Sequence, residues 1–304
     1  MGTSYGSANL ITPPREEEEI YPYRRAWQSV ITEMGVLLVI ISVLFIGALF
    51  LGIRVPATLA VPMNYALALL PAALWGIFSF VREYSVPEPR ERLLLVFILS
   101  VLVANAVGIP LVEDLLRPEE WLMSQSTVNR ILGYAFTVGI AQELLKYIVI
   151  RYAAWPSWFR IRSDGVAYAA AAAIGYATIS SLHFVSTNPT AQVDAIALRV
   201  LAIVTMNLIP TLVIGYGLSQ TLFDRANVFV LAVTLSIAAI LAGFIVAFRS
   251  GVINAPLDFT ISATRPLIGY LFTVAVSVVP LAALYFLSSV AELRAQQLGQ
   301  DAEA

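Results

Sequence analysis

Three polar side chains within one apolar segment carry the most unusual chemistry of this sequence. Gln142, Glu143 and Lys146 lie in a hydrophobic run from about Ile131 to Ala153. On an α-helix, Lys146 follows Glu143 by three positions and Gln142 by four, so all three are expected on one face, where they can satisfy one another. Because an ionised group near the centre of a bilayer is costly, these side chains must face protein or water.

Two interpretations of this polar group follow from its position alone. Glu143 and Lys146 form either a mutually neutralised structural pair packed against a neighbouring helix, or the centre of a functional site. The second interpretation has support because ionisable residues within membranes often mark active sites and transport pathways.

The composition places the polar group in an integral membrane protein. The chain has 304 residues, of which 59% are hydrophobic and 12% charged, and a mean hydropathy of +0.81. A soluble globular protein carries about twice that charged fraction. The net charge of -2 and the dispersed basic residues exclude a nucleic-acid-binding surface, and the absence of Cys excludes disulfides and thiolate chemistry. We predict an all-α, polytopic transmembrane helix bundle.

Eight apolar segments have about the ~20 residues that a helix needs to cross a bilayer. They form a predicted transmembrane domain at residues 34–290, after a polar, partly mobile leader at 1–33 and before a tail at 291–304. The predicted spans are 34–53, 63–81, 93–112, 131–153, 165–187, 195–218, 228–248 and 267–288.

The distribution of arginines predicts the orientation of these spans, because positively charged loops stay on the cytoplasmic side. With the N-terminus inside, the inner segments hold most arginines, and both termini are cytoplasmic in what we predict to be the plasma (cytoplasmic) membrane. The inner arginines are then Arg15, Arg24, Arg25, Arg82, Arg90, Arg92, Arg151, Arg160, Arg162, Arg225 and Arg294, and the outer ones Arg54, Arg117, Arg130, Arg249 and Arg265.

The fifth predicted span carries a stripe of small residues. Such a stripe lets helix backbones approach closely, and packing holds helices together in lipid, so this helix is expected at the centre of the bundle. The neighbouring face carries hydroxyl groups. The stripe consists of Gly165, Ala169, Ala173, Ala177 and Ser181, and the hydroxyl face of Tyr168, Tyr176 and Ser180.

Further polar residues lie toward the predicted outer side. We interpret His183, the only histidine, as a hydrogen-bonding residue at the interface, because nothing nearby supplies further metal ligands at usable spacing. We therefore predict no metal and no cofactor. The acidic segment from Glu113 to Arg130 is interpreted as a solvated, partly helical cap rather than as an external pair of catalytic carboxylates.

The sixth predicted span contributes two polar residues with open roles. Arg199 either extends toward the outer interface or neutralises a carboxylate in the bundle. Asn207 lies deeper, where its amide needs partners, so it either bonds to another helix or belongs to the polar centre.

The order of motifs around these residues resembles that of a known family. The sequence has Gln-Glu-Leu-Leu-Lys at 142–146, Asp-Gly-Val-Ala-Tyr at 164–168, Gly-Tyr-Ala-Thr at 175–178, Arg199 and Ile-Gly-Tyr at 214–216. This order resembles the PrsW family of intramembrane proteases, which is related to the CPBP (CAAX-processing and bacteriocin-processing) membrane proteases. The resemblance extends over about residues 139–220.

The resemblance implies several site positions and several substitutions at them. The family has a Glu-Glu pair before the lysine, a Phe-x-x-x-Glu motif in the next span and a His in the span after it. In this sequence the pair falls on Gln142 and Glu143, the second motif on Tyr176 and Ser180, and the His on Asn207. Gln, Ser and Asn can orient a water molecule but cannot act as a base near neutral pH, whereas peptide hydrolysis needs a base.

These substitutions leave three functions open. Our first prediction is a PrsW-like membrane protein that keeps the fold, has lost most or all proteolytic activity, and binds membrane partners within the lipid bilayer. The alternatives are an active glutamate-dependent intramembrane endopeptidase acting on a single-span substrate, or a structural subunit of a larger membrane complex. The predicted catalytic residues are Glu143, Lys146 and Gln142, with Ser180, Asn207, Tyr176 and Arg199 in supporting positions.

Overall fold

The computed structural model describes residues 25–85, 89–122, 124–223, 229–252 and 264–303. Within these ranges the chain is helical and contains no strand. The all-α prediction is therefore confirmed for the described part of the chain. Residues 1–24 of the predicted leader lie outside it.

The helices follow one another through short connections, and four segments, labelled η, are π-helical. Their bounds are α1 (Ala26–Leu51), α2 (Ala57–Trp75), η1 (Gly76–Val81), α3 (Arg82–Tyr84), α4 (Leu93–Val103), η2 (Ala104–Gly108), η3 (Leu111–Leu116), α5 (Pro118–Leu122), α6 (Thr127–Tyr134), η4 (Ala135–Gly139), α7 (Ile140–Ala153), α8 (Ser163–Thr187), α9 (Val193–Phe223), α10 (Phe229–Val252) and α11 (Thr264–Glu303).

Seven helical stretches of the described chain are long and apolar enough to cross a membrane. They correspond to seven of the eight predicted spans: Ala26–Leu51, Thr58–Tyr84, Leu93–Leu122, Ser163–Thr187, Val193–Phe223, Phe229–Phe248 and Leu267–Ala291. The remaining prediction, 131–153, falls on α6, η4 and α7, which are helical without a break from Thr127 to Ala153. This stretch contains Gln142, Glu143 and Lys146, which lower its hydropathy, and its role as the eighth span stays a prediction.

Two predicted boundaries differ from the structure. Helix α1 begins at Ala26 rather than near residue 34, so the last part of the predicted leader is helical, and Trp27 and Val30 are buried there. The polar residues of this first part, including Glu33, obscured its helical character in the sequence, yet Glu33 is buried and accepts a hydrogen bond from Ser79. At the other end, α11 continues as a helix to Glu303, through the predicted tail.

Helices α8 and α9 form the centre of the bundle, as the stripe of small residues predicts. The apolar window of α8 is 83% buried and that of α9 is 94% buried, against 22% for α1. The two helices touch at Gly165 and Gly215, where a Cβ atom on either residue would overlap the carbonyl oxygen of the other. This close approach requires glycine at both positions.

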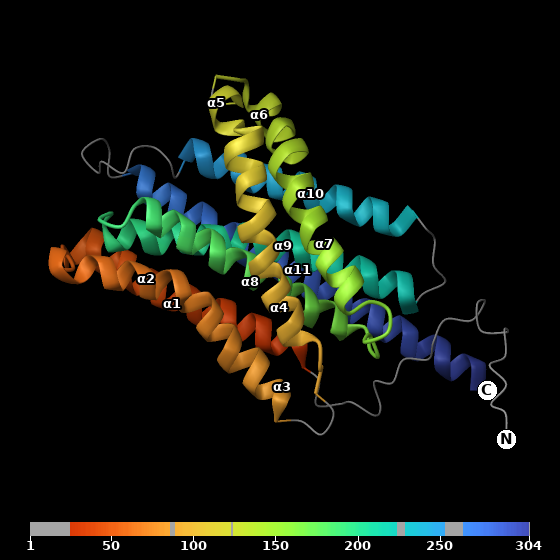
Figure 1. Ribbon diagram of the computed structural model, residues 1–304. Coiled ribbons are helices and arrows are strands. Elements are labelled where there is room, and N and C mark those ends of the chain that lie inside the picture. Colours follow the sequence, from red (N-terminus) through yellow and green to blue (C-terminus); the bar gives the residue numbers. More distant parts are fainter. Residues whose placement is uncertain (1–24, 86–88, 123, 224–228, 253–263, 304) are drawn as a thin grey trace.

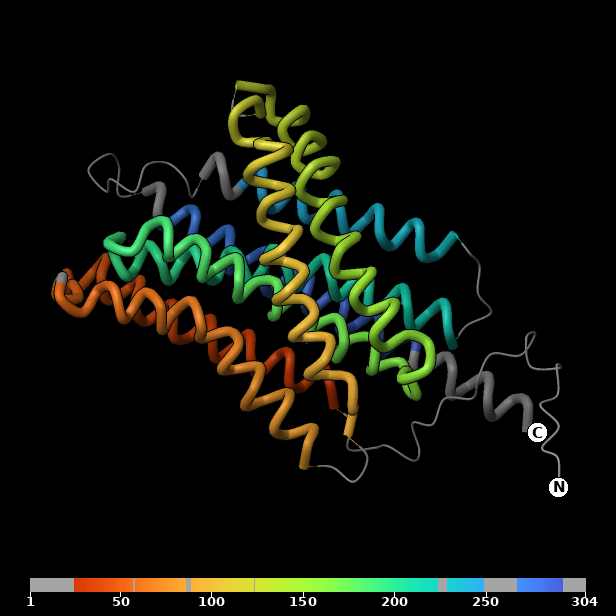
Figure 2. Tube along the Cα trace, viewed as in Figure 1, coloured from red at the N-terminus to blue at the C-terminus, as the bar shows by residue number. Residues whose placement is uncertain are grey.

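The remaining helices surround this centre (Figure 1). Helices α1 and α2 lie together along one side, and α10 runs along another. Helices α4 and α7 form an antiparallel pair that crosses α8 and α9 at a steep angle, with α5 and α6 at its far end (Figure 2). Large apolar side chains on the outer surface of α1, among them Val39, Val43 and Phe50, are exposed, as expected for contact with the lipid bilayer.

An ion-pair network fixes the turn between α7 and α8. The Arg90 guanidinium lies 2.7 Å from Asp164 and 2.5 Å from Glu83, and Asp164 accepts hydrogen bonds from the backbone N–H groups of Arg160 and Ile161. Burial alone would lower the pKa of Arg90, but Asp164 and Glu83 outweigh it and raise this pKa above its ordinary value. The network therefore holds the start of α8 in place, with the Arg90 guanidinium between two carboxylates.

Candidate functional site

Four side chains from α7 and α9 form what we call the buried polar cluster: Glu143, Lys146, Asn207 and Thr211. The Lys146 ammonium donates to Glu143 Oε1 at 2.5 Å and to Asn207 Oδ1 at 3.0 Å. The Thr211 hydroxyl lies 3.0 Å from Glu143 Oε2 and 2.6 Å from the carbonyl oxygen of Asn207, so its one proton is shared between the two acceptors. All four side chains are buried, with 1% exposure or less.

The ring of Tyr176 on α8 covers the buried polar cluster from one side. Its centroid lies 5.3 Å from Lys146 Nζ, a distance typical of a cation–π contact. The Tyr176 hydroxyl packs against Gly108 of η2, where a Cβ atom would overlap it. Gly108 therefore leaves the space that the Tyr176 hydroxyl needs.

The contacts of Glu143 limit the chemistry that it can perform. One carboxylate oxygen binds the ammonium of Lys146 and the other lies against the Thr211 hydroxyl, and the residue is 1% exposed. To take a proton from a water molecule, Glu143 would have to exchange one of these contacts for water. As arranged, the pair is electrically neutral and closes a polar gap between α7 and α9.

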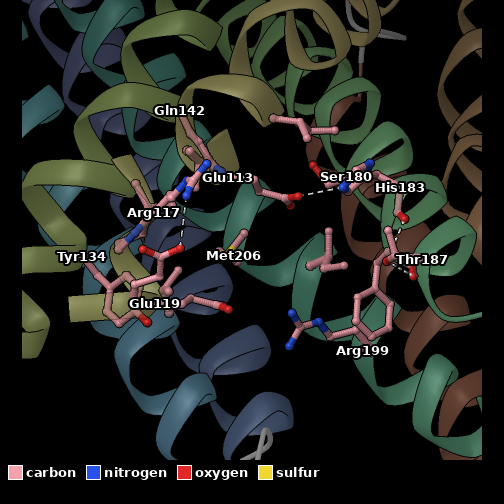
Figure 3. Close-up of a pocket in the computed structure, with 18 residues that line it drawn as sticks. Glu113, Arg117, Glu119, Tyr134, Gln142, Ser180, His183, Thr187, Arg199 and Met206 are labelled. Carbon is pink, nitrogen blue, oxygen red and sulfur yellow. Dashed lines mark hydrogen bonds and ion pairs between the residues drawn. The ribbon is translucent and has the colours of Figure 1, made fainter. Parts of the chain in front are cut away.

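Gln142, the neighbour of Glu143 in the chain, faces a different place. It lines a cavity of about 410 Å³ together with Ser180 of α8 and Arg199 of α9 (Figure 3), which we call the Gln142 cavity. The cavity also has apolar walls, among them Met206 and Val246. Gln142 and Ser180, at which the resemblance predicts carboxylates in the PrsW pattern, thus line one cavity.

The acidic segment near the end of α4 forms another wall of the Gln142 cavity. Glu113 of η3 lies 2.7 Å from Nε2 of His183 on α8, and Glu119 and Glu120 of α5 also line the cavity. His183 makes a hydrogen bond, as predicted. The segment is partly helical and exposed, also as predicted, but its place beside Gln142 was not foreseen, because no local pattern relates η3 to α8.

Of the predicted group of Gln142, Glu143 and Lys146, the structure pairs Glu143 with Lys146, whereas Gln142 lines the cavity. Successive helical residues point about 100° apart, and the crossing of α7 over its neighbours directs Gln142 into the cavity while Glu143 points to α9. The structure brings Glu143, Lys146 and Asn207 together, places Tyr176 against them, and puts Gln142, Ser180 and Arg199 in the cavity. Sequence reasoning missed Thr211, which its spacing of four from Asn207 could have indicated.

Three π-helical segments border both regions. η2 ends at Gly108 beneath Tyr176, η3 contains Glu113, and η4 ends at Gly139 just before the residues of α7 that form the site. π-Helical turns inside α-helices are rare and occur frequently at functional sites. Their arrangement here agrees with a site built from the cluster and the cavity.

A comparison with models of protein families identifies the family of this chain. A model described as PrsW family intramembrane metalloprotease matches residues 88–281. The chain belongs to the PrsW family. The matched range contains α4 to α10 and part of α11, and so the buried polar cluster and the Gln142 cavity. Comparisons with curated proteins and with solved structures found no significant match.

The description of the family implies a metal ion, and the residues of this PrsW family member can be tested for one. Within the described ranges, no group of three or more His, Cys, Asp or Glu side chains is placed to hold a metal. At Glu143, the Lys146 ammonium already lies 2.5 Å from one oxygen, where a metal cation would bind. The described residues therefore do not fit a bound metal, and we derive no step through one.

Proposed function

We propose that this PrsW family member has lost most or all glutamate-dependent peptide hydrolysis and acts by binding membrane partners. One observation carries the proposal. Glu143, the one carboxylate among the positions that the resemblance assigns to the site, is buried and engaged by Lys146 at 2.5 Å.

The loss of the other carboxylates supports this proposal. Two carboxylates in one buried site push their proton affinities apart, which provides an acid and a base together. Gln142 and Ser180 share a cavity in which such a pair would meet, but they supply an amide and a hydroxyl group. These groups donate and accept hydrogen bonds without taking a proton from water at neutral pH.

The same substitutions suit binding. The Gln142 cavity, at about 410 Å³, lies within the size range of ligand pockets. Its walls combine apolar side chains with the Gln142 amide and the Ser180 hydroxyl, and such groups hydrogen-bond a polypeptide backbone while apolar walls take its side chains. We infer that a segment of a membrane protein occupies it.

Proteolysis in liposomes tests the loss of activity. The purified chain and its Glu143→Gln variant are reconstituted with a single-span reporter protein tagged at both ends, and a family member that keeps the full motif serves as positive control. We expect the control to cut the reporter and the parent chain to leave it intact. Cleavage by the parent that Glu143→Gln abolishes would establish the alternative, an active endopeptidase.

Photo-crosslinking tests the binding. A photoreactive amino acid replaces Gln142 in the cavity or, as a matched control on the same helix, Ile148, which is 40% exposed on the outer surface. We expect discrete protein adducts from position 142 and mainly lipid adducts from position 148. Equal adduct patterns from the two positions would contradict a partner in the cavity.

A further inference from the structure

We propose that Ser180, His183 and Glu113 form a reactive hydroxyl centre in the Gln142 cavity, in which Ser180 attacks an acyl ester with an apolar chain. This centre uses none of the buried polar cluster. It does not depend on the proposed loss of glutamate-dependent proteolysis, but the acyl ester and the proposed partner segment would compete for the same cavity.

The contact between Glu113 and His183 orients the imidazole. An ionised carboxylate only accepts hydrogen bonds, so across the 2.7 Å contact a neutral His183 donates its Nε2–H to Glu113. The lone pair then lies on Nδ1, which has no hydrogen-bond partner in the part of the chain that the structure describes. A histidine held in one tautomer by a carboxylate is the arrangement of a general base.

Ser180 lies three residues before His183 on α8. Residues at this spacing are neighbours on a helix surface, and helical side chains lean toward the N-terminus, which brings the His183 ring over the turn of Ser180. Figure 3 shows the two side chains next to each other on the wall that faces Glu113. The Ser180 hydroxyl donates to the carbonyl oxygen of Tyr176 at 3.0 Å, so the proposed attack requires a different χ1 rotamer, in which this hydroxyl donates to His183.

The rest of the Gln142 cavity favours an acyl ester. Gln142 stands on another helix, and its amide N–H can donate to the oxygen that gains negative charge during attack on a carbonyl group. Ile203, Met206 and Val246 give the cavity apolar walls that suit an aliphatic acyl chain. The charged side chains of Arg117, Glu119, Glu120 and Arg199 also line the cavity, beside these apolar walls.

The proposed reaction transfers the acyl group of the ester first to Ser180 and then to water. Ser180 Oγ bonds to the carbonyl carbon while its proton passes to Nδ1 of His183. The bond between that carbon and the alcohol oxygen then breaks, and the alcohol leaves with the proton from His183. Water attacks the acyl-serine by the same route, which releases the carboxylic acid and restores Ser180.

An alkyl fluorophosphonate tests this centre, because it phosphonylates an activated serine and releases fluoride. The full-length protein in detergent micelles is treated with the probe, and peptide mass spectrometry locates the adduct in the parent chain itself. We expect modification at Ser180. An unmodified parent chain, or an adduct at another residue, would overturn the proposal.

The rates at which variants are modified then distinguish a serine activated by His183 from a serine that is only accessible to the probe. We expect Ser180→Ala to abolish the modification and His183→Ala to slow it by about 10²-fold, the lower end of the usual contribution of a general base. Ser186→Ala is the matched control, since Ser186 is exposed on the same helix and donates to the His183 carbonyl oxygen. It should react as fast as the parent chain. A His183→Ala variant that elutes as a folded protein and reacts at the parental rate would contradict the role of His183.

Discussion

Two adjacent residues, Gln142 and Glu143, belong to two contrasting regions of this protein. Glu143 lies in the buried polar cluster, where every polar group has a partner and no side chain is more than 1% exposed. Gln142 lines a cavity of about 410 Å³ whose polar groups come from six elements: η3, α5, α6, α7, α8 and α9. Two consecutive residues of α7 therefore differ in their surroundings: Glu143 is buried among bonded partners, and Gln142 lines a cavity.

The difference shows two ways in which a membrane protein can hold polar residues. In the buried polar cluster, the charges of Glu143 and Lys146 neutralise each other. Removal of one partner leaves the other charge buried without compensation, which lowers the free energy of unfolding. In the cavity, Gln142 is half-buried and faces open space, so it can change with little effect on the fold. The first arrangement stabilises, and the second is available to a ligand.

The largest effect should follow from the loss of Lys146. Lys146→Met leaves the carboxylate of Glu143 buried without a cation, and we expect the free energy of unfolding to fall by about 3–5 kcal/mol. Equilibrium unfolding in mixed detergent micelles measures this loss. The double variant Glu143→Gln/Lys146→Met removes both charges and should regain more than half of it. If Lys146→Met costs less than about 1 kcal/mol, the pair is not the structural contact that we describe.

The next largest effect should follow from separating the two central helices. Gly165→Ala places a Cβ atom against the carbonyl oxygen of Gly215, which cannot move aside without shifting α9. We expect a loss of about 1–3 kcal/mol in the same unfolding experiment. Because α8 and α9 contribute to both regions, the cluster and the cavity should be disturbed together. Gly35→Ala is the control, since its Cβ meets no atom within 4 Å; it should be neutral or slightly stabilising.

A smaller effect should follow from the loss of one hydroxyl group in the cluster. Thr211→Val keeps the shape of the side chain but removes the bond to Glu143, and we expect a loss of about 1 kcal/mol. Thr221→Val on the same helix is the control, because the Thr221 hydroxyl donates only to the backbone of its own helix. A larger loss from Thr221→Val than from Thr211→Val would contradict the importance of the cluster.

The smallest effect should follow from a change in the cavity. Gln142→Ala should alter the free energy of unfolding by no more than about 0.5 kcal/mol, because Gln142 is half-buried and faces open space. The same variant removes the amide proposed to donate to the substrate oxygen, so fluorophosphonate modification of Ser180 should slow. A decrease in the free energy of unfolding as large as that of Lys146→Met would contradict the difference that we describe between the cluster and the cavity.

Several features of this protein could be predicted from local patterns. Long apolar segments predict membrane helices, because a helix must cover about 30 Å of hydrocarbon. The spacing of Glu143 and Lys146 predicts their ion pair, which forms at 2.5 Å. The stripe that begins at Gly165 predicts close packing, and α8 is central. The motif order predicts the family, which matches residues 88–281.

Other features depend on how the helices cross, which no local pattern records. The angle between α7 and its neighbours decides that Gln142 faces the cavity while Glu143 faces Asn207 and Thr211. The contact of Glu113 with His183 joins residues separated by 70 positions. The sequence alone therefore determined the long apolar helices and which polar residues need partners, since hydrophobicity and helical periodicity act over a few turns. Only the tertiary structure decided which partners they find, because the relative rotation and crossing of packed helices set every long-range contact.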